Sequence, residues 1–121
     1  MKRNRSISEA ELEIMEVLWK ENKPMTIQAI CDSIDGEKWK YNTVGTMLLR
    51  LADKEAVSFE KIGRVIYYSP VIKREDYKKE QTNQLISKLY NGSARELAVS
   101  ILGSSEISKE DLDEIKKMFN L

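Results

Sequence analysis

The side chains that could do chemistry lie in the stretch YNTVGTMLLRLADK, residues 41–54. Its apolar residues recur at the spacing that gathers side chains on one face of a helix: Val44, Met47, Leu48 and Leu51. The opposite face carries short, mostly uncharged residues and one arginine: Asn42, Thr43, Gly45, Thr46, Leu49, Arg50 and Asp53. A helix that is only solvated usually carries Glu and Lys there. These small side chains therefore indicate that another molecule comes close to the helix.

Covalent catalysis is poorly supported by the composition. The chain has no His, which removes the commonest general base and the usual activator of a nucleophile. A single cysteine, Cys31, excludes an internal disulfide or a thiolate cluster, and its apolar surroundings predict a small core residue. No Asp-x-Asp-Gly loop or glycine-rich phosphate cradle is present. We expect no enzyme activity, no metal site and no cofactor.

The overall composition is that of a small globular protein. At 121 residues, with 41% hydrophobic and 33% charged residues, the chain allows one domain or a domain with a small appendage. No apolar run approaches the ~20 residues that cross a bilayer. The basic start at residues 1–5 lacks the apolar stretch of a secretion signal. A soluble, cytoplasmic protein without membrane insertion is expected.

Charge is distributed unevenly along this neutral chain. Residues 38–64 hold six basic and three acidic side chains, a local balance of +3, whereas residues 75–121 hold seven basic and nine acidic side chains, a balance of −2. A phosphate group responds to charge within a Debye length of ~8 Å. Overall neutrality therefore does not exclude a nucleic-acid partner.

Three helices are expected before residue 56. Ser8 to Glu11 has the pattern of a capping box, and the helix that follows should end near Asn22. Thr26 can cap a short second helix that Asp35–Gly36 would close. The third helix is expected to begin at Asn42 or Thr43 and to run to about Glu55.

A β-hairpin is expected after the third helix. Alternating strand residues stand at Val57 and Phe59 and again at Val65, Tyr67 and Ser69. Ile62 to Arg64 would form the turn, with Lys61 and Arg64 at or beside its tip, and Pro70 would end the second strand.

Three helices followed by a hairpin with a basic tip describe a winged helix-turn-helix, with residues 41–54 as the recognition helix. The acid-free start of the helix face and the basic tip together suit a protein that touches base edges with one element and phosphates with the other. The same elements also occur in small cores without a nucleic-acid role and in winged helices that bind proteins.

The C-terminal region predicts three short helices, separated at Asn91–Gly92 and at residues 103–105, with Ser108 to Asp111 capping the last. Fewer than 50 residues bury too little surface to be stable alone. Their apolar faces must meet either the winged domain or, as we favour, a second copy. We divide the chain into a winged-helix domain, residues 1–72, and a helical dimerisation region, residues 73–121. The expected dimer contacts are Tyr77, Leu85, Ile86, Leu89, Tyr90, Leu97, Ile101, Leu102, Leu112, Ile115, Met118 and Phe119.

Four segments resemble the penicillinase-repressor family, the BlaI/MecI/CopY group of transcriptional regulators. They are ISEAELEIMEVLW at 7–19, NTVGTMLLRLADKEAV at 42–57, VIYYSPVI at 65–72 and LISKLYNGSARELAVSIL at 85–102. The likeness follows the family's order along nearly the whole chain from Ile7. The fold it implies is mainly α with a small β-hairpin wing: a winged helix-turn-helix DNA-binding domain and a C-terminal dimerisation region.

The resemblance also implies a homodimeric repressor that binds a two-fold operator, often at a promoter for β-lactam resistance. By position, it assigns base reading to Asn42, Thr43, Gly45, Thr46 and Arg50, wing contacts to Arg64 and Tyr67, and backbone contacts to Thr26 and Ile27. Including the neighbouring basic and aromatic residues, the expected DNA-binding set is Thr26, Ile27, Lys40, Tyr41, Asn42, Thr43, Gly45, Thr46, Arg50, Lys61, Arg64 and Tyr67.

Two departures from the family pattern affect these expectations. Members commonly have Arg in place of Gly45 and a polar residue in place of Leu49, which suggests a shifted operator preference or weaker binding. In the β-lactam branch, a membrane-bound sensor metalloprotease signals and the repressor is cut at an Asn-Phe pair, which aligns here with Ser100–Ile101. The cysteine-rich tail of the copper-responsive branch is missing.

Two alternatives to an operator-binding repressor stay open. A winged-helix module could grip a protein through the face that bears Thr46 and Leu49. A repressor could also sense a small ligand in a pocket between wing and dimer helices, although no convergent polar cluster supports one.

Overall fold

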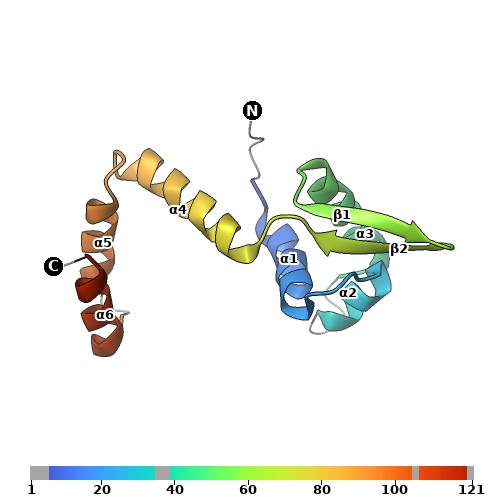
Figure 1. The fold of residues 1–121 in the computed structure, drawn as a ribbon, viewed down its shortest axis with the longest axis horizontal. Coiled ribbons are helices and arrows are strands. Elements are labelled where there is room, and N and C mark those ends of the chain that lie inside the picture. The colour runs from blue at the N-terminus through green and yellow to red at the C-terminus, as the bar shows by residue number, and fades with distance from the viewer. Residues whose placement is uncertain (1–5, 35–38, 105–106, 120–121) are drawn as a thin grey trace. The chain divides into compact units, whose positions relative to one another are not determined.

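The computed structural model describes residues 6–34, 39–104 and 107–119. These residues form six helices and one antiparallel hairpin. The chain divides into two compact units, Met1–Arg74 and Glu75–Leu121. In Figure 1, the first unit holds α1, α2, α3 and the hairpin β1–β2, and the second holds most of α4 together with α5 and α6.

Helix α1, Glu9–Glu21, begins at the predicted capping box. The Glu11 N–H donates to Ser8 Oγ at 3.2 Å, and the Ser8 N–H donates to Glu11 Oε1 at 2.9 Å. Two backbone donors of the first turn are thereby satisfied, which confirms the capping box. The helix ends at Asn22, whose left-handed φ of 51° is tolerated by asparagine.

Helices α2, Ile27–Ser33, and α3, Tyr41–Asp53, form the helix-turn-helix. Thr26 caps α2 as predicted, since its Oγ1 accepts from the Ala29 N–H at 3.1 Å. The predicted closing pair Asp35–Gly36 lies outside the described residues. Helix α3 begins at Tyr41, earlier than the predicted start at Asn42 or Thr43. Lys40 takes the cap conformation without a side-chain hydrogen bond, so the preferred cap residues become part of the first turn.

Helix α3 ends earlier than expected, in a Schellman turn. The Ala56 N–H donates to Leu51 O at 2.9 Å, and the Glu55 N–H donates to Ala52 O at 3.0 Å. Glu55 has a φ of 61°, the left-handed conformation that helices usually reserve for glycine at this position. The predicted helix end near Glu55 is therefore two residues late, because no glycine marks the turn.

The predicted hairpin is confirmed. Strand β1, Val57–Ile62, pairs with β2, Val65–Pro70, and Ile62 faces Val65. This register leaves a two-residue turn in which Gly63 has a φ of 66°. The backbone groups of Met25 and Tyr68 exchange two hydrogen bonds of 2.9 and 2.7 Å, so the α1–α2 connection extends the sheet beyond β2.

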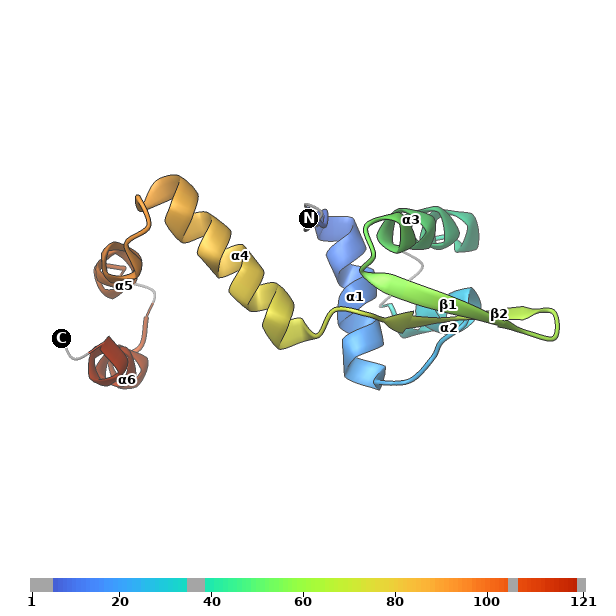
Figure 2. The ribbon, with the colours of Figure 1, turned by 45° about the horizontal axis from the view of Figure 1, so that its top comes forward.

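In a half-buried strand, alternate residues are buried along one face. The two strands of the hairpin do not show this pattern. Val57 and Tyr68 are buried, whereas Phe59, Val65 and Ile66 are exposed. Tyr68 rather than Tyr67 points into the core, and its ring lies 6.1 Å from that of Phe59. Most of the hairpin therefore projects from the unit as a wing (Figures 1 and 2).

The core of the first unit is built from its three helices. The largest fully buried side chains are Ile14, Met15, Leu18, Ile30, Val44, Leu48 and Leu51. They include three residues of the predicted apolar face of α3, and the fourth, Met47, is also buried, which confirms the periodicity. Three helices packed in this way and followed by an antiparallel wing are the winged helix-turn-helix that the sequence predicts.

The second unit contains three helices: α4, Arg74–Leu89, α5, Ala94–Leu102, and α6, Lys109–Phe119. The first residue of α4, Arg74, belongs to the first unit. Asn91 and Gly92 have positive φ values and interrupt the helical conformation between α4 and α5, as predicted. Ser108 caps α6 through a 3.1 Å bond from the Asp111 N–H. Figures 1 and 2 show α5 and α6 side by side.

Candidate nucleic-acid interface

The outward face of α3 is open to solvent. Asn42, Thr43, Thr46 and Arg50, the predicted base-reading side chains other than Gly45, are all exposed. The predicted neighbours Lys40 and Tyr41 are exposed as well. Asp53, in the last turn, is the one acidic residue of α3. The face therefore offers short hydrogen-bonding groups and a guanidinium, with negative charge only at its C-terminal end.

Thr46 and Gly45 do not point equally outward. The Thr46 Oγ1 donates to Asn42 O at 3.0 Å, so the hydroxyl hydrogen is used within the helix. Gly45 is half-buried on the side of α3 next to α2, where an added Cβ would lie 3.5 Å from Ile27 Cδ1. Gly45 therefore lies at the edge of the open face.

Two hydrogen bonds fix α3 to α1, one near each end. Before α3, Trp39 Nε1 donates to Glu13 Oε2 at 2.6 Å. After α3, Lys54 Nζ lies 2.6 Å from Glu11 Oε1 and donates to Ser6 O at 2.7 Å. Both ends of the candidate recognition helix are thus held by one neighbouring element. None of these contacts was predicted.

Glu11 is the buried charged residue of the described core, with 2% of its surface exposed. Burial is the largest influence on its pKa and raises it. Hydrogen bonds from Lys54 and Ser8, with the positive charge of Lys54, outweigh burial and bring the pKa below its ordinary value. Glu11 Oε2 has no hydrogen-bond partner among the described residues. The carboxylate therefore depends on Lys54 for its charge compensation.

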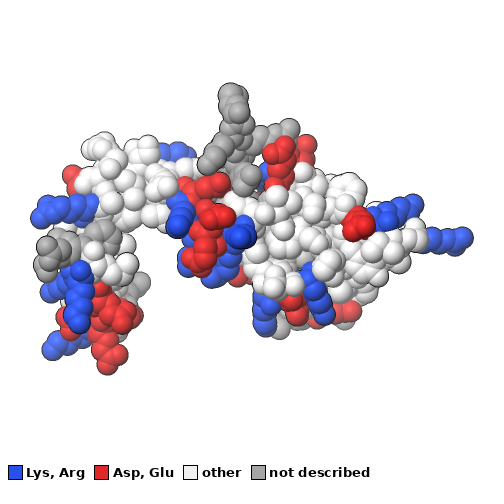
Figure 3. Space-filling model, viewed as in Figure 1, with Lys and Arg blue, Asp and Glu red and all other residues white. Residues whose placement is uncertain are grey.

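The wing carries its basic residues at the tip. Lys61 and Arg64 are exposed on either side of Gly63, and Figure 3 shows Lys and Arg side chains projecting at the end of the hairpin. Tyr67, further down β2, is half-buried. Cationic groups on a projecting hairpin can reach phosphates beside a groove that the helix occupies.

Thr26 and Ile27, the residues expected at the DNA backbone, lie at the start of α2. The Thr26 hydroxyl caps the helix, accepting from Ala29, and retains its own hydrogen for donation to a phosphate. Ile27 is half-buried beside Gly45 and supports α3. Thr26, the N-cap of α2, therefore keeps a donor for backbone contact.

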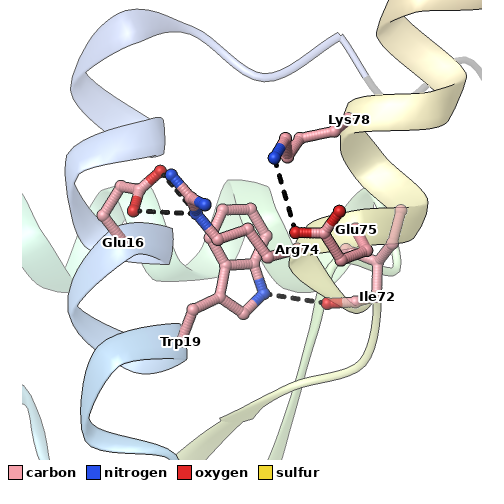
Figure 4. Close-up of polar contacts among 6 residues, drawn as sticks. All are labelled: Glu16, Trp19, Ile72, Arg74, Glu75 and Lys78. Carbon is pink, nitrogen blue, oxygen red and sulfur yellow. Dashed lines mark hydrogen bonds and ion pairs between the residues drawn. The ribbon is translucent and has the colours of Figure 1, made fainter. Parts of the chain in front are cut away.

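The end of the first unit is fastened to α1 (Figure 4). Trp19 Nε1 donates to Ile72 O at 3.0 Å, and Arg74 Nε lies 3.2 Å from Glu16 Oε2. Lys78 and Glu75 form a separate, exposed pair at 3.4 Å on α4. The point at which the chain leaves the first unit is therefore set by α1.

The predicted dimer contacts differ in exposure. Tyr77 is buried, and the Phe119 side chain lies outside the described set. The exposed members are Leu85, Leu89, Ile101 and Met118. The half-buried members are Ile86, Tyr90, Leu97, Leu102, Leu112 and Ile115. The possible cleavage site Ser100–Ile101 lies inside α5, where Ser100 Oγ accepts from the Tyr90 hydroxyl at 3.2 Å.

Leu49, which the sequence placed on the outward face of the helix, is 65% exposed on the open face. Sequence reasoning missed two contacts that hold α3 in place. The Glu11–Lys54 and Glu13–Trp39 contacts join residues 43 and 26 positions apart, and no local pattern announces them. Within the described ranges, no group of three or more potential metal ligands occurs and no helix is long and apolar enough to cross a membrane.

An open, short-side-chain third helix and a basic hairpin on this fold define a winged helix-turn-helix protein of the nucleic-acid-binding class. A profile described as penicillinase repressor matches residues 7–120. The penicillinase repressor of Bacillus licheniformis is 35% identical over 115 residues, which cover 95% of this chain and 90% of the relative. The chain belongs to the penicillinase repressor family, a family of repressors rather than enzymes.

Two solved structures are similar to the winged part of the chain. The solution structure of the DNA-binding domain of the repressor BlaI has a TM-score of 0.54 and 40% identity, covering 64% of this chain and 94% of that one. The Bacillus licheniformis BlaI monomeric form in complex with the blaP half-operator has a TM-score of 0.52 at the same identity and coverage. These matches agree with the fold found here.

Proposed function

We propose that this protein is a homodimeric transcriptional repressor that binds two-fold operator DNA in the cytoplasm. Helix α3 enters the major groove and the wing contacts the backbone. The observation that carries the proposal is the exposed face of α3, where Thr43, Thr46 and Arg50 stand free of covering elements. An α-helix fits a groove ~12 Å wide, and Thr and Arg match its base edges. The complex of the similar BlaI with the blaP half-operator supports operator DNA as the partner.

The residues divide into base-reading and backbone-binding groups. Asn42, Thr43, Thr46 and Arg50 face the bases, with Gly45 at the margin. Lys40, Tyr41, Lys61, Arg64, Tyr67 and Thr26 contact the backbone, and Ile27 supports α3. Base contacts provide sequence discrimination, whereas phosphate contacts contribute affinity that is similar for all duplexes.

Dimerisation is assigned to the second unit. Leu89 and Met118 are 70% and 80% exposed, and Leu85 and Ile101 are also open. These exposed apolar side chains favour contact with a second copy. A two-fold dimer would present two α3 helices to two half-sites and so double the sequence that is read.

Relief of repression by proteolysis, as in the β-lactam branch, would act on the same unit. Ser100–Ile101 lies in the last turns of α5, and a protease needs an extended peptide, so this turn must unwind before cleavage. Cleavage there would remove α6 and weaken the dimer. A membrane sensor metalloprotease system is the signalling partner that this reading requires.

The central test is selection of bound duplexes from a random pool, followed by gel-shift titration of the selected sequence. We expect a two-fold symmetric site. Thr46→Ala should reduce discrimination between selected and scrambled duplexes by ~1 to 3 kcal/mol. Arg64→Ala should weaken binding to both duplexes alike. Arg95→Ala, which removes one exposed charge from α5, is the matched control and should change neither.

Oligomeric state is tested separately by analytical ultracentrifugation. Leu89→Lys should shift the protein toward monomer without unfolding it, because Leu89 is exposed. Val71→Lys, an equally drastic change at an exposed site of the first unit, should leave the dimer intact. A wild-type monomer at micromolar concentration would contradict the dimer.

A second candidate function is protein binding through α3, favoured by the exposure of Leu49. The salt dependence of the binding constant distinguishes DNA binding from protein binding. If Lys40, Lys61 and Arg64 of each copy neutralise phosphates, log K should fall against log salt with a slope of roughly −5. A protein-binding groove would respond weakly, and equal affinity for every duplex would defeat the repressor proposal.

A further inference from the structure

Leu49 is the large apolar side chain in the middle of the open face of α3. It is 65% exposed, and the other exposed large apolar residue of α3, Tyr41, lies at the helix start. Thr46 precedes Leu49 by one turn and Asp53 follows it by one turn on the same side of the helix. A leucine in this place has no role in the core of the unit.

The neighbouring Thr46 extends the apolar character of this spot. Its hydroxyl donates to Asn42 O at 3.0 Å, so the methyl group is the part of the side chain without a hydrogen-bonding role. Residues three apart on a helix have Cβ atoms about 5–6 Å apart. Leu49 and the Thr46 methyl group therefore form a small apolar strip, bordered by Arg50.

We infer that Leu49 reads thymine by packing against its C5 methyl group in the major groove. The inference rests on the proposed function, which places this face against base edges. Thymine is the base that presents a methyl group there, and apolar side chains contact it. Against any other base, Leu49 would cover a polar edge and leave its donors or acceptors without partners.

The surroundings of Leu49 favour a duplex over a protein as the partner. A protein-binding helix usually continues its apolar anchors at i+3, i+4 and i+7. The residues at those spacings from Leu49 are Ala52, Asp53 and Ala56; of these Asp53 is acidic and Ala56 is buried in the core. Leu49 therefore offers one isolated apolar contact among the polar side chains of Thr43, Thr46 and Arg50. Such a contact suits the methyl group of a single base, whereas a hydrophobic groove on a protein needs several apolar contacts.

The test replaces the thymines of the selected duplex by deoxyuridine, one position at a time. Each replacement removes the methyl group and keeps all hydrogen bonds. Binding of the full-length protein is measured by fluorescence anisotropy. For wild type, one thymine in each half-site should show an affinity loss of about fourfold on replacement, the value of one buried methyl group. In Leu49→Ala this loss should vanish at that thymine. Arg64→Ala, the control, should bind more weakly but keep the fourfold ratio.

Two results would overturn the inference, and each is distinct from failure of the proposed function. Site-specific binding in which Leu49→Ala keeps the full deoxyuridine penalty would show that another residue contacts the methyl group. Tight, specific binding with no deoxyuridine penalty at any position would show that no methyl group is read. Equal, weakly salt-dependent affinity for all duplexes would instead overturn the proposed function, and this inference with it. Circular dichroism of Leu49→Ala verifies that this exposed substitution preserves the fold.

Discussion

Replacing Lys54 by methionine would remove the charge that compensates Glu11 while keeping most of the aliphatic stem. The two side chains meet at 2.6 Å, and they are 3% (Glu11) and 28% (Lys54) exposed. Removing one partner of a buried pair costs ~3–5 kcal/mol, because a buried charge is left uncompensated. Water reaches the Lys54 side, so we expect the lower end, about 3 kcal/mol at pH 7, out of a total stability of about 5–15 kcal/mol.

The pH dependence of this loss provides a sharper signature. In wild type the pKa of Glu11 lies below its ordinary value, since hydrogen bonds from Lys54 and Ser8 outweigh burial. The contribution of the Glu11 carboxylate to the free energy of unfolding is therefore present above the unfolded pKa of about 4.3 and is lost as pH falls through the folded pKa. Without Lys54, only the hydrogen bonds with Ser8 oppose burial, and we expect the pKa of Glu11 to rise above its ordinary value. Stability of Lys54→Met should then increase as pH falls from 7 toward 5, where that of wild type is flat.

Urea unfolding followed by tryptophan fluorescence at pH 7 and pH 5 measures both effects. Trp19 and Trp39 both lie in the first unit, so the signal reports the unit that contains the pair. All variants are compared at one protein concentration, because the proposed dimerisation would couple to stability. Arg74→Met is the matched control, since its pair with Glu16 in the same unit is exposed and contributes ~0–1 kcal/mol. A loss below about 1 kcal/mol, or parallel pH profiles for wild type and Lys54→Met, would refute the reasoning.

Three further changes test how α3 is built and held. Gly45→Ala should stabilise the fold by up to ~1 kcal/mol, because an added Cβ meets Ile27 only at ordinary contact distance; thermal unfolding measures the gain, and a loss would show a clash. Glu55→Gly should stabilise by about 1 kcal/mol, since glycine adopts the φ of 61° without strain, and an unchanged melting temperature would argue against that strain. Trp39→Phe should cost roughly 1–2 kcal/mol by removing the 2.6 Å bond to Glu13, measured by circular dichroism in urea.

Local signals in the sequence predicted the parts of the fold that local chemistry decides. Ser8 and Glu11 satisfy each other's backbone across three residues, so the capping box is legible in four letters. Thr26 caps α2 for the same reason. The periodicity of Val44 to Leu51 fixed the buried face of α3, and with it the face that is left open.

The errors arose where the usual residue is missing or where partners are distant in the chain. The end of α3 was placed late because Glu55 occupies a position that glycine normally announces. Alternation alone could not show whether Tyr67 or Tyr68 is buried. Tyr68 forms the backbone bridge to Met25 and is the buried ring. Glu11 was assigned only to its cap, although its carboxylate also holds Lys54 across 43 residues.

Helix α1 emerges as the element that relates the candidate interface to the rest of the first unit. Its N-terminal half holds both ends of α3 through Glu11 and Glu13, and its C-terminal half holds Ile72 and Arg74 through Trp19 and Glu16. The orientation of α3 and the point at which the chain leaves the first unit are therefore both held by contacts with α1. In the proposed dimer, the spacing between half-sites depends on both. Changes at these α1 contacts should therefore alter the preferred half-site spacing, whereas changes on the open face of α3 alter which bases are preferred.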